Sequence, residues 1–216
     1  MYKRQVSGNW AGLRVSDYSQ VSLEGSTVSD NGNYGLYVAA SAQVSLQDST
    51  VSGNELYGLE AWDSARVNLQ DSTVSGNGDN GLVVADSSQV SLQDSTVSDN
   101  EYAGLWVVDS AQAILTNSTV SDNGYYGLFV GHFAQVSIEG NGTADACKAD
   151  CGNGIYVRNE AHVELTKTTI RDNTGWGIAA CLEKCEYFTD AFEGTVLWED
   201  RGNEIYDNGK GDVCLP

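Results

Sequence analysis

The sequence predicts an all-β fold, a parallel β-helix (solenoid) built from turns of 23 residues. Residues 43–54 return almost unchanged as residues 89–100, with Gly53 replaced by Asp99. A Gly-Leu or Gly-Ile pair marks each repeat at a constant spacing, with one insertion before the last two pairs. These pairs begin at Gly12, Gly35, Gly58, Gly81, Gly104, Gly127, Gly154 and Gly177. An internal repeat of this length is the signature of a stacked repeat architecture.

Each repeat contains three short strands. Apolar residues alternate with polar ones in three bursts, of which one repeat shows Leu36 and Val38, then Val44 and Leu46, then Val51. Alternation with a period of two is typical of a half-buried strand. The segments between the bursts are rich in Gly, Asn, Asp, Ser and Ala, which are the residues that tight corners require. Three strands and three corners therefore complete one turn.

A single turn cannot bury its apolar side chains, whereas parallel turns stacked in register bury a continuous apolar column. This arrangement predicts three parallel sheets around one core. An asparagine recurs at one corner of the turn, and identical amides stacked along the axis can bond to one another. The members of this column are Asn31, Asn54, Asn77, Asn100, Asn123, Asn173 and Asn208.

With an apolar-x-x-Asn corner followed by Gly-Leu/Ile-x-Val, residues 8–178 resemble the repeats of right-handed parallel β-helix proteins in the pectin-lyase-like superfamily. The resemblance implies a right-handed coil and an association with polysaccharides, as a lyase, a hydrolase, an epimerase or a binding protein. It does not decide among these functions, because the repeat motif reports packing.

The chain is expected to divide into β-helix turns over residues 1–180, with a loop insertion at 143–153, and a C-terminal cap over residues 181–216. The insertion adds four residues and removes the corner asparagine from its turn. After Gly177 the register dissolves into a tract rich in aromatic residues. Solenoids need a cap, because a bare last turn exposes apolar core and unpaired strand edges. Its expected plug consists of Phe188, Phe192, Val196, Leu197 and Trp198.

The five cysteines are confined to the last third of the chain: Cys147, Cys151, Cys181, Cys185 and Cys214. They are interpreted as disulfide staples, which would place the protein in an oxidising compartment, secreted or at the cell surface. The expected pairs are Cys147 with Cys151, and Cys181 or Cys185 with Cys214. Free thiols, or zinc held by the two C-x₃-C pairs, are the alternatives.

The composition excludes some partners. The chain has 11 Lys and Arg against 30 Asp and Glu, a formal net charge of −19. Nucleic-acid affinity comes mainly from basic residues that neutralise phosphates, so nucleic acid is excluded as a partner. No run of 18 apolar residues is present, which predicts no membrane span.

One outward column of the predicted sheet becomes aromatic along the rod. Between the inward residues of the first strand stand Tyr37, Glu60, Trp106, Phe129 and Tyr156, and nearby corners add Trp62 and Tyr126. Flat rings suit the faces of sugars, and carboxylates suit hydroxyl groups or a bridging calcium ion. The sequence therefore predicts a non-catalytic module that binds polysaccharide through an exposed aromatic and acidic strip, with calcium as a candidate helper. The competing interpretation is a structural scaffold whose aromatic residues only pack along the sheet.

A polysaccharide lyase or hydrolase is the alternative function. Such an enzyme needs localised carboxylates with a basic partner, and the sequence offers only Arg66 near Asp63 and Glu60, or Arg158 with Asp86 and Asp109. His132 and His162 receive no role.

A third surface favours a weaker alternative, an ice-binding protein. Outward threonines and serines form two columns across five turns and resemble the Thr-x-Thr face of ice-binding solenoids. The columns are Thr27, Thr50, Thr73, Thr96 and Thr119, and Ser29, Ser52, Ser75, Ser98 and Ser121. Arg171 interrupts this array, and threonine is in any case common in strands.

The first turn is expected to lack a cap, because only five residues precede its first strand. Apolar residues such as Leu13, Val21 and Leu23 would then lie beside unpaired backbone groups. A homodimer formed through this turn is the expected consequence, favoured by salt because of the negative charge.

Overall fold

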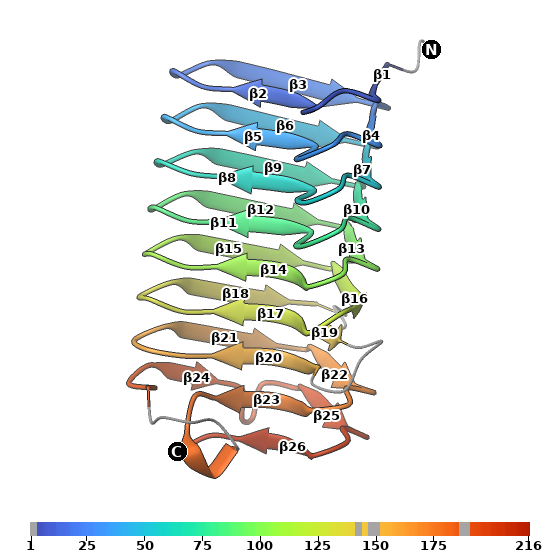
Figure 1. Ribbon diagram of the computed structural model, residues 1–216. Helices are drawn as coiled ribbons and strands as arrows, with labels where there is room; N and C mark the ends of the chain where they lie inside the picture. Colours follow the sequence, from blue (N-terminus) through green and yellow to red (C-terminus); the bar gives the residue numbers. More distant parts are fainter. Residues whose placement is uncertain (1–3, 141–143, 147–151, 186–190) are drawn as a thin grey trace.

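The chain coils into a solenoid whose turns stack along one axis, with the two termini at opposite ends (Figure 1). The computed structural model describes residues 4–140, 144–146, 152–185 and 191–216. All strand pairs are parallel, and residues 23 apart face each other in the regular turns, as Leu82 does with Leu59 and Leu105. The predicted fold class is confirmed.

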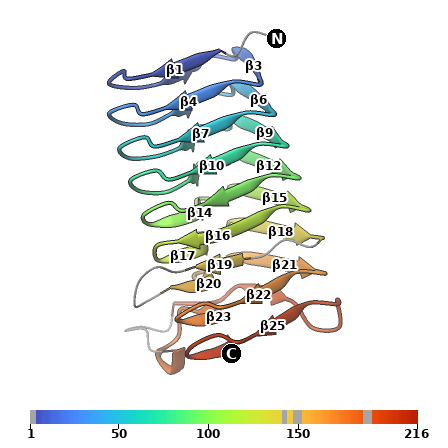
Figure 2. The ribbon, with the colours of Figure 1, turned by 90° about the vertical axis from the view of Figure 1, so that its right-hand side faces the viewer.

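The first sheet is the hydroxyl sheet, named for its outward Thr and Ser residues, and Figure 2 views the molecule from this side. Its seven strands are β1 (Gln5–Ser7), β4 (Thr27–Ser29), β7 (Thr50–Ser52), β10 (Thr73–Ser75), β13 (Thr96–Ser98), β16 (Thr119–Asn123) and β19 (Ala144–Ala146). A separate pair, β22 (Thr169–Arg171) and β25 (Glu204–Tyr206), follows it along the rod.

The second sheet is the aromatic sheet, whose arrows lie at the front of Figure 1. Its nine strands are β2 (Leu13–Val15), β5 (Leu36–Val38), β8 (Leu59–Ala61), β11 (Leu82–Val84), β14 (Ala103–Val107), β17 (Tyr126–Val130), β20 (Asn153–Val157), β23 (Trp176–Ala180) and β26 (Gly211–Cys214). A short 3-10 helix, η1 (Glu183–Cys185), follows β23.

The third sheet is the glutamine sheet, named for its outward Gln residues. Its eight strands are β3 (Gln20–Glu24), β6 (Gln43–Gln47), β9 (Arg66–Gln70), β12 (Gln89–Gln93), β15 (Gln112–Thr116), β18 (Gln135–Glu139), β21 (His162–Thr166) and β24 (Thr195–Leu197).

The core is the column of inward residues that the periodicity predicts. The five apolar residues of one turn, Leu36, Val38, Val44, Leu46 and Val51, are each at most 2% exposed. They belong to one continuous apolar cluster that runs the length of the rod. Burial of this column is the main driving force that holds successive turns together.

Close packing at the corner requires the glycine of the Gly-Leu pair in the regular turns, at Gly35, Gly58, Gly81 and Gly104. A Cβ at Gly58 would lie 2.6 Å from the Gly81 carbonyl oxygen and 2.7 Å from Nδ2 of Asn77. Contacts this short are forbidden, so only glycine fits beside the stacked asparagine. The repeat marker and the asparagine column therefore depend on each other.

The asparagine column forms a buried hydrogen-bond ladder, as predicted. Asn54 Nδ2 donates to Asn77 Oδ1 at 2.9 Å, and Asn77 Nδ2 donates to Asn100 Oδ1 at 2.8 Å. Each side-chain oxygen also accepts from the backbone N–H of the asparagine one turn earlier, as Asn77 does from Asn54 at 3.1 Å. The ladder thus satisfies polar groups that the corner buries.

A second ladder, which the sequence analysis missed, occupies the corner between the glutamine sheet and the hydroxyl sheet. The backbone N–H of Ser49 donates to Ser72 Oγ at 3.1 Å, and that of Ser72 donates to Ser95 Oγ at 3.2 Å. These serines are 2% exposed. The repeated Asp-Ser dipeptide is the signal that could have revealed it.

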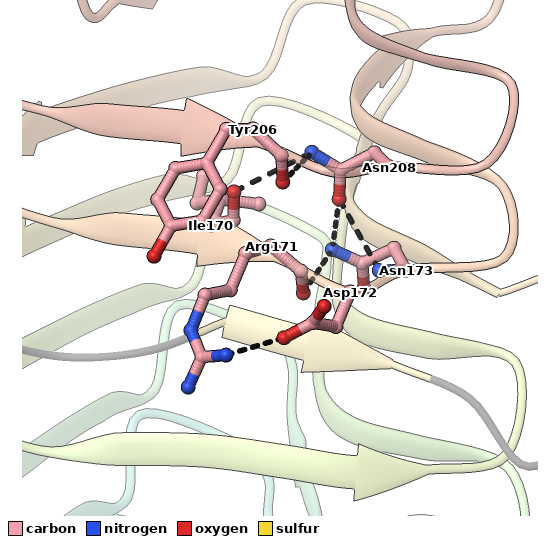
Figure 3. Close-up of polar contacts among 6 residues, drawn as sticks. All are labelled: Ile170, Arg171, Asp172, Asn173, Tyr206 and Asn208. Atoms are coloured by element: carbon pink, nitrogen blue, oxygen red, sulfur yellow. Dashed lines mark hydrogen bonds and ion pairs between the residues drawn. The ribbon is translucent and has the colours of Figure 1, made fainter.

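The hydroxyl sheet is interrupted at the insertion. The pairing of β16 with β19 shifts register between Val120 and Asn123. After the insertion the asparagine ladder resumes, because Asn173 Nδ2 donates to Asn208 Oδ1 at 2.8 Å (Figure 3). In Figure 3 the side chain of Arg171 extends from the outer side of β22 to Asp172, with which it forms an ion pair.

The C-terminal segment continues the stack. Strands β24, β25 and β26 pair with β21, β22 and β23, so residues 195–214 add a strand to each side of the rod. Of the expected plug residues, Phe192, Val196 and Trp198 pack against the core, whereas Leu197 is 43% exposed. Phe188 lies outside the described residues. That residues 181–216 close the rod as a separate cap remains a prediction.

At the other end, Leu13, Val21 and Leu23 of the first turn are only partly buried. The homodimer through this turn remains a prediction. The described residues contain no helix with the length and apolar character that a membrane span requires.

Candidate functional site: the outer face of the aromatic sheet

Strand register places the predicted strip on the outer face of the aromatic sheet. The outward column runs Arg14, Tyr37, Glu60, Val83, Trp106, Phe129, Tyr156 and Ala179, each residue paired with the next. Trp62 and Tyr126 stand beside this column, one just after β8 and the other at the start of β17. The seven residues predicted to bind sugar therefore lie on one face, which we call the aromatic face.

Several of these rings pack on one another. Trp106 and Phe129 are stacked, with ring centroids 3.5 Å apart and planes inclined by 5°. Tyr126 and Tyr156 are stacked with centroids 5.3 Å apart. Together with Ala85, Val108, Ala179 and Cys181, the rings form a second apolar cluster outside the main core.

This cluster corrects one expectation. Phe129 and Tyr156 are each only 5% exposed, so the prediction that the whole strip is exposed is wrong for these two rings. Their outward direction was right, but neighbouring rings and the column Ala85, Val108 and Cys181 cover them. Phe129 and Tyr156 therefore serve as the support on which the half-exposed rings rest.

The half-exposed rings form two groups along the rod. Near its beginning, the rings of Tyr34 and Tyr37 are 5.5 Å apart, and the Arg14 guanidinium lies 5.2 Å from the Tyr37 ring centroid. Further along, the ring centroid of Tyr102 lies 5.8 Å from that of Trp106 and 5.1 Å from that of Tyr125. These corner tyrosines extend the aromatic face beyond the seven residues predicted to bind sugar.

Glu60 lies between the two groups. Its Oε1 accepts a hydrogen bond from Trp62 Nε1 at 3.3 Å. Burial raises the pKa of Glu60, and the hydrogen bond from Trp62 lowers it in part. A half-buried carboxylate bound to an indole N–H is thus held at the centre of the aromatic face.

A second carboxylate, Asp79, was missed. Burial raises the pKa of Asp79, and a hydrogen bond with the Asn80 backbone lowers it in part. Burial raises the pKa of Tyr57, and the negative charges of Asp79 and Glu60 raise it further. The pKa of Tyr102 is raised by burial, by Asp79 and by Tyr125. The signal was available, because Asp79 stands 23 residues before Tyr102.

Exposed aspartates border the face where the chain leaves each strand. Asp63, Asp86 and Asp109 occupy the same corner in three successive turns, each with a positive φ. Asp109 Oδ1 lies 3.1 Å from His132 Nδ1. Within the described parts of the chain, neither Arg66 nor Arg158 forms an ion pair with these carboxylates. The two arginine–carboxylate groups on which the enzyme interpretation depended are therefore not seen as ion pairs. Among the described residues, no three His, Cys, Asp or Glu side chains are grouped so that they could hold a metal ion.

A separate hollow of about 470 Å³ lies on the outer face of the glutamine sheet. It contains His162, Glu164, the 51% exposed Ile114 and the 43% exposed Leu197. Glu164 forms an ion pair with Arg201 at the C-terminal side. The sequence analysis gave His162 no role and missed this hollow, although Ile114 and His162 break the regular Gln-x-Ser pattern there.

The hydroxyl face is regular over five turns. Thr50, Thr73 and Thr96 are directly paired, as are Ser52, Ser75 and Ser98, and all are partly exposed. The two predicted columns therefore exist, and Arg171 stands outside the seven-stranded sheet on β22. Ice binding by this face remains a prediction.

The disulfide predictions are confirmed for one pair. Cys185 and Cys214 are bonded, with Cα atoms 5.8 Å apart, and this bond joins η1 to β26. Cys181 is buried in the second apolar cluster. Cys147 and Cys151 lie outside the described residues, so their pairing remains a prediction.

Comparison with known proteins supports this fold. A family model described as "Right handed beta helix region" matches residues 1–143 and 104–211. A search of curated protein sequences found no match.

Three solved structures share the fold at low sequence identity. The periplasmic alginate epimerase AlgG is 14% identical with a TM-score of 0.71, over 93% of this chain and 57% of its own. The A-module of mannuronan C-5 epimerase AlgE4 from Azotobacter vinelandii is 17% identical with a TM-score of 0.67, over 95% of this chain and 56% of its own. Pectate lyase Pel9A is 12% identical with a TM-score of 0.64, over 82% of this chain and 59% of its own.

This chain thus spans less than two thirds of the length of these three proteins. At such identities the structural likeness shows the fold alone. The family match covers most of the sequence, and it agrees with the parallel sheets, the buried apolar column and the asparagine ladder. The chain therefore belongs to the family of right-handed β-helix proteins.

Proposed function

We propose that this β-helix binds polysaccharide through the aromatic face and acts outside the cytosol. The observation that carries the proposal is the set of half-exposed rings, Tyr37, Trp62, Trp106 and Tyr126, which stand on four of five successive turns with Glu60 among them. Aromatic faces pack well against sugar rings, and carboxylates accept hydrogen bonds from sugar hydroxyls. A site that repeats along the rod suits an extended polymer.

The dimensions support a polymer as the ligand. Four strand steps separate Tyr37 from Phe129, and at about 4.8 Å for each step the face extends about 20 Å along the axis. The buried rings of Phe129 and Tyr156 hold this surface rigid, which lowers the entropy that binding must overcome. The names of the structural neighbours agree with a polysaccharide as the general kind of ligand, since two are alginate or mannuronan epimerases and one is a pectate lyase.

The location rests on the Cys185–Cys214 disulfide, because structural disulfides persist in oxidising compartments. The similarity to a periplasmic epimerase agrees with this location.

A glycan array tests the binding proposal. The wild-type protein is expected to bind one or more polysaccharides. The Trp62→Ala and Trp106→Ala variants should lose that binding, while Ile114→Ala should retain it, because Ile114 is 51% exposed and lies on the glutamine sheet. Retention of full binding by both face variants would contradict the proposal.

A polysaccharide lyase or hydrolase is the second candidate function. The specific observation in its favour is the raised pKa of Glu60 beside Tyr57 and Asp79. A carboxyl group whose pKa is raised is a candidate general acid, and hydrolysis uses a second carboxylate as its partner. Release of reducing ends or of unsaturated sugars, lost in Glu60→Gln, would establish this activity. Unchanged product release in Glu60→Gln would exclude Glu60 as its acid.

A further inference from the structure

We propose that the aromatic face selects polymers of amino sugars, whose ammonium groups its carboxylates receive, and excludes polyuronates. This inference rests on the proposed function, because it names the ligand class of the same face. Acidic residues greatly outnumber basic ones at the middle of the rod. Residues 55–110 contain ten acidic residues and a single basic one, Arg66. Arg66 begins β9 on the glutamine sheet, so it does not belong to the aromatic face.

The two inner carboxylates lack a cationic partner from the protein. Glu60 and Asp79 are both partly buried, and no ion pair joins either of them to a basic group in the described parts of the chain. Their hydrogen bonds come from neutral donors, Trp62 Nε1 and the Asn80 side chain, the second at 2.8 Å. Removing a carboxylate from water is costly unless a cation compensates it. An ammonium group on the ligand would supply that compensation.

The border of the aromatic face is also negatively charged. Asp63, Asp86 and Asp109 form a column of exposed carboxylates along the axis, one for each turn. Asp109 Oδ1 lies 3.1 Å from His132 Nδ1, and among the described residues no ion pair joins Asp63 or Asp86 to a basic group. A polymer laid along the rings would therefore meet carboxylates on successive turns. Repeated amines would be attracted at each step, whereas repeated carboxylates would be repelled.

The basic groups near the face stand toward its two ends. Arg14, on the first turn, has its guanidinium over the Tyr37 ring of the next turn. Arg158 lies near Phe129 and donates a hydrogen bond from Nε to Asn159 Oδ1. Neither reaches the middle, where Glu60, Asp79 and Asp86 would oppose a polyanion. A neutral polymer could contact the rings, but it would leave the two inner carboxylates without a counter-charge.

Three soluble probes of equal length test the proposal: a glucosamine hexamer, its N-acetylated counterpart and a galacturonic acid hexamer. Binding is measured by calorimetry near pH 6 at two salt concentrations. We expect the glucosamine hexamer to bind at least tenfold more tightly than its N-acetylated counterpart and to weaken with salt. The galacturonic acid hexamer should not bind.

Matched variants separate a specific site from the general attraction of a protein of charge −19. Glu60→Gln with Asp79→Asn should weaken binding of the glucosamine hexamer about tenfold. Asp71→Asn with Asp94→Asn removes the same charge from exposed positions that follow the glutamine sheet, and it should change binding less than twofold. Equal losses in the two double variants would overturn the proposal, because the attraction would then come from overall charge.

The other outcomes are equally decisive. If the N-acetylated hexamer binds as tightly as the amine form, or if the galacturonic acid hexamer binds best, the amine preference is wrong. Loss of that binding in Trp62→Ala and Trp106→Ala would leave the proposed function intact. If both tryptophan variants bind every probe as the wild type does, the proposed function fails together with the inference.

Discussion

Replacing one rung of the asparagine ladder should destabilise the whole rod, and Asn77→Ala is the most informative variant. The Asn77 side chain makes three hydrogen bonds. Its Oδ1 accepts from the backbone N–H of Asn54 at 3.1 Å and from Asn54 Nδ2 at 2.9 Å, and its Nδ2 donates to Asn100 Oδ1 at 2.8 Å. Asn54, Asn77 and Asn100 are each at most 1% exposed, so water does not replace these bonds readily.

The magnitude follows from this count. A buried hydrogen bond contributes about 1 kcal/mol net, and a buried donor left without an acceptor costs about 1–3 kcal/mol. Asn77→Ala removes three hydrogen bonds and leaves the buried backbone N–H of Asn54 without its acceptor. The free energy of unfolding should therefore fall by about 3–5 kcal/mol. The backbone bond from Asn77 N to Asn100 Oδ1 is retained, which keeps the effect from spreading further.

Urea unfolding followed by circular dichroism measures this loss. Gln89→Ala is the matched control, because Gln89 is exposed and its side chain makes one 3.4 Å bond to the next turn. That control should change the free energy of unfolding by less than about 0.5 kcal/mol. If Asn77→Ala and Gln89→Ala lower the free energy of unfolding by the same amount, the asparagine ladder does not stabilise the rod.

Three further predictions concern the core, the aromatic face and the disulfide. Leu82→Asp buries a carboxylate at a position that is 0% exposed and should prevent folding at 25 °C, whereas Ser91→Asp on the outer face should leave the thermal midpoint almost unchanged; equal damage from both would show that the register is wrong. Because burial raises the pKa of Glu60 in the folded state, its contribution to stability is present below its unfolded pKa and is lost as pH rises through the folded value. Glu60→Gln should therefore raise the thermal midpoint at pH 7 and have little effect in acid, and a lower midpoint at pH 7 would contradict the assigned cause. Cys185→Ser opens a link between residues 29 apart in the chain, for which loop entropy predicts a loss of about 3–4 kcal/mol, measured by urea unfolding without reductant; no loss would mean that the Cys214 bond does not form in solution.

The sequence was sufficient to predict the fold because the repeat reports the same local environment many times. Leu36, Val44 and Val51 alternate with polar neighbours, and their equivalents recur at intervals of 23 residues. Each recurrence confirms the direction of the side chain and the register of the strand. The corner asparagine adds a polar contact that only stacking in register can satisfy.

The candidate site was harder to predict because it depends on contacts between columns. Periodicity showed that Phe129 and Tyr156 point away from the core, but it could not show that neighbouring rings and Cys181 cover them. The role of Asp79 depends on its proximity to Tyr57 and Tyr102 across turns. The C-terminal segment was harder still, because β24–β26 rejoin the sheets without a constant spacing.

The five tryptophans offer the most direct test of the proposed binding face. A nitrogen-correlated NMR spectrum resolves one indole N–H signal for each. Three of them, Trp62, Trp106 and Trp176, pack in the second apolar cluster on the aromatic face, and Trp62 and Trp106 belong to the proposed binding surface. Titration with a polysaccharide fragment that binds should shift the signals of Trp62 and Trp106, while the signal of Trp198, which packs against the main core near the C-terminal end, should not move. Binding that leaves the signals of Trp62 and Trp106 in place would contradict the account and direct attention to the hollow around His162 and Leu197.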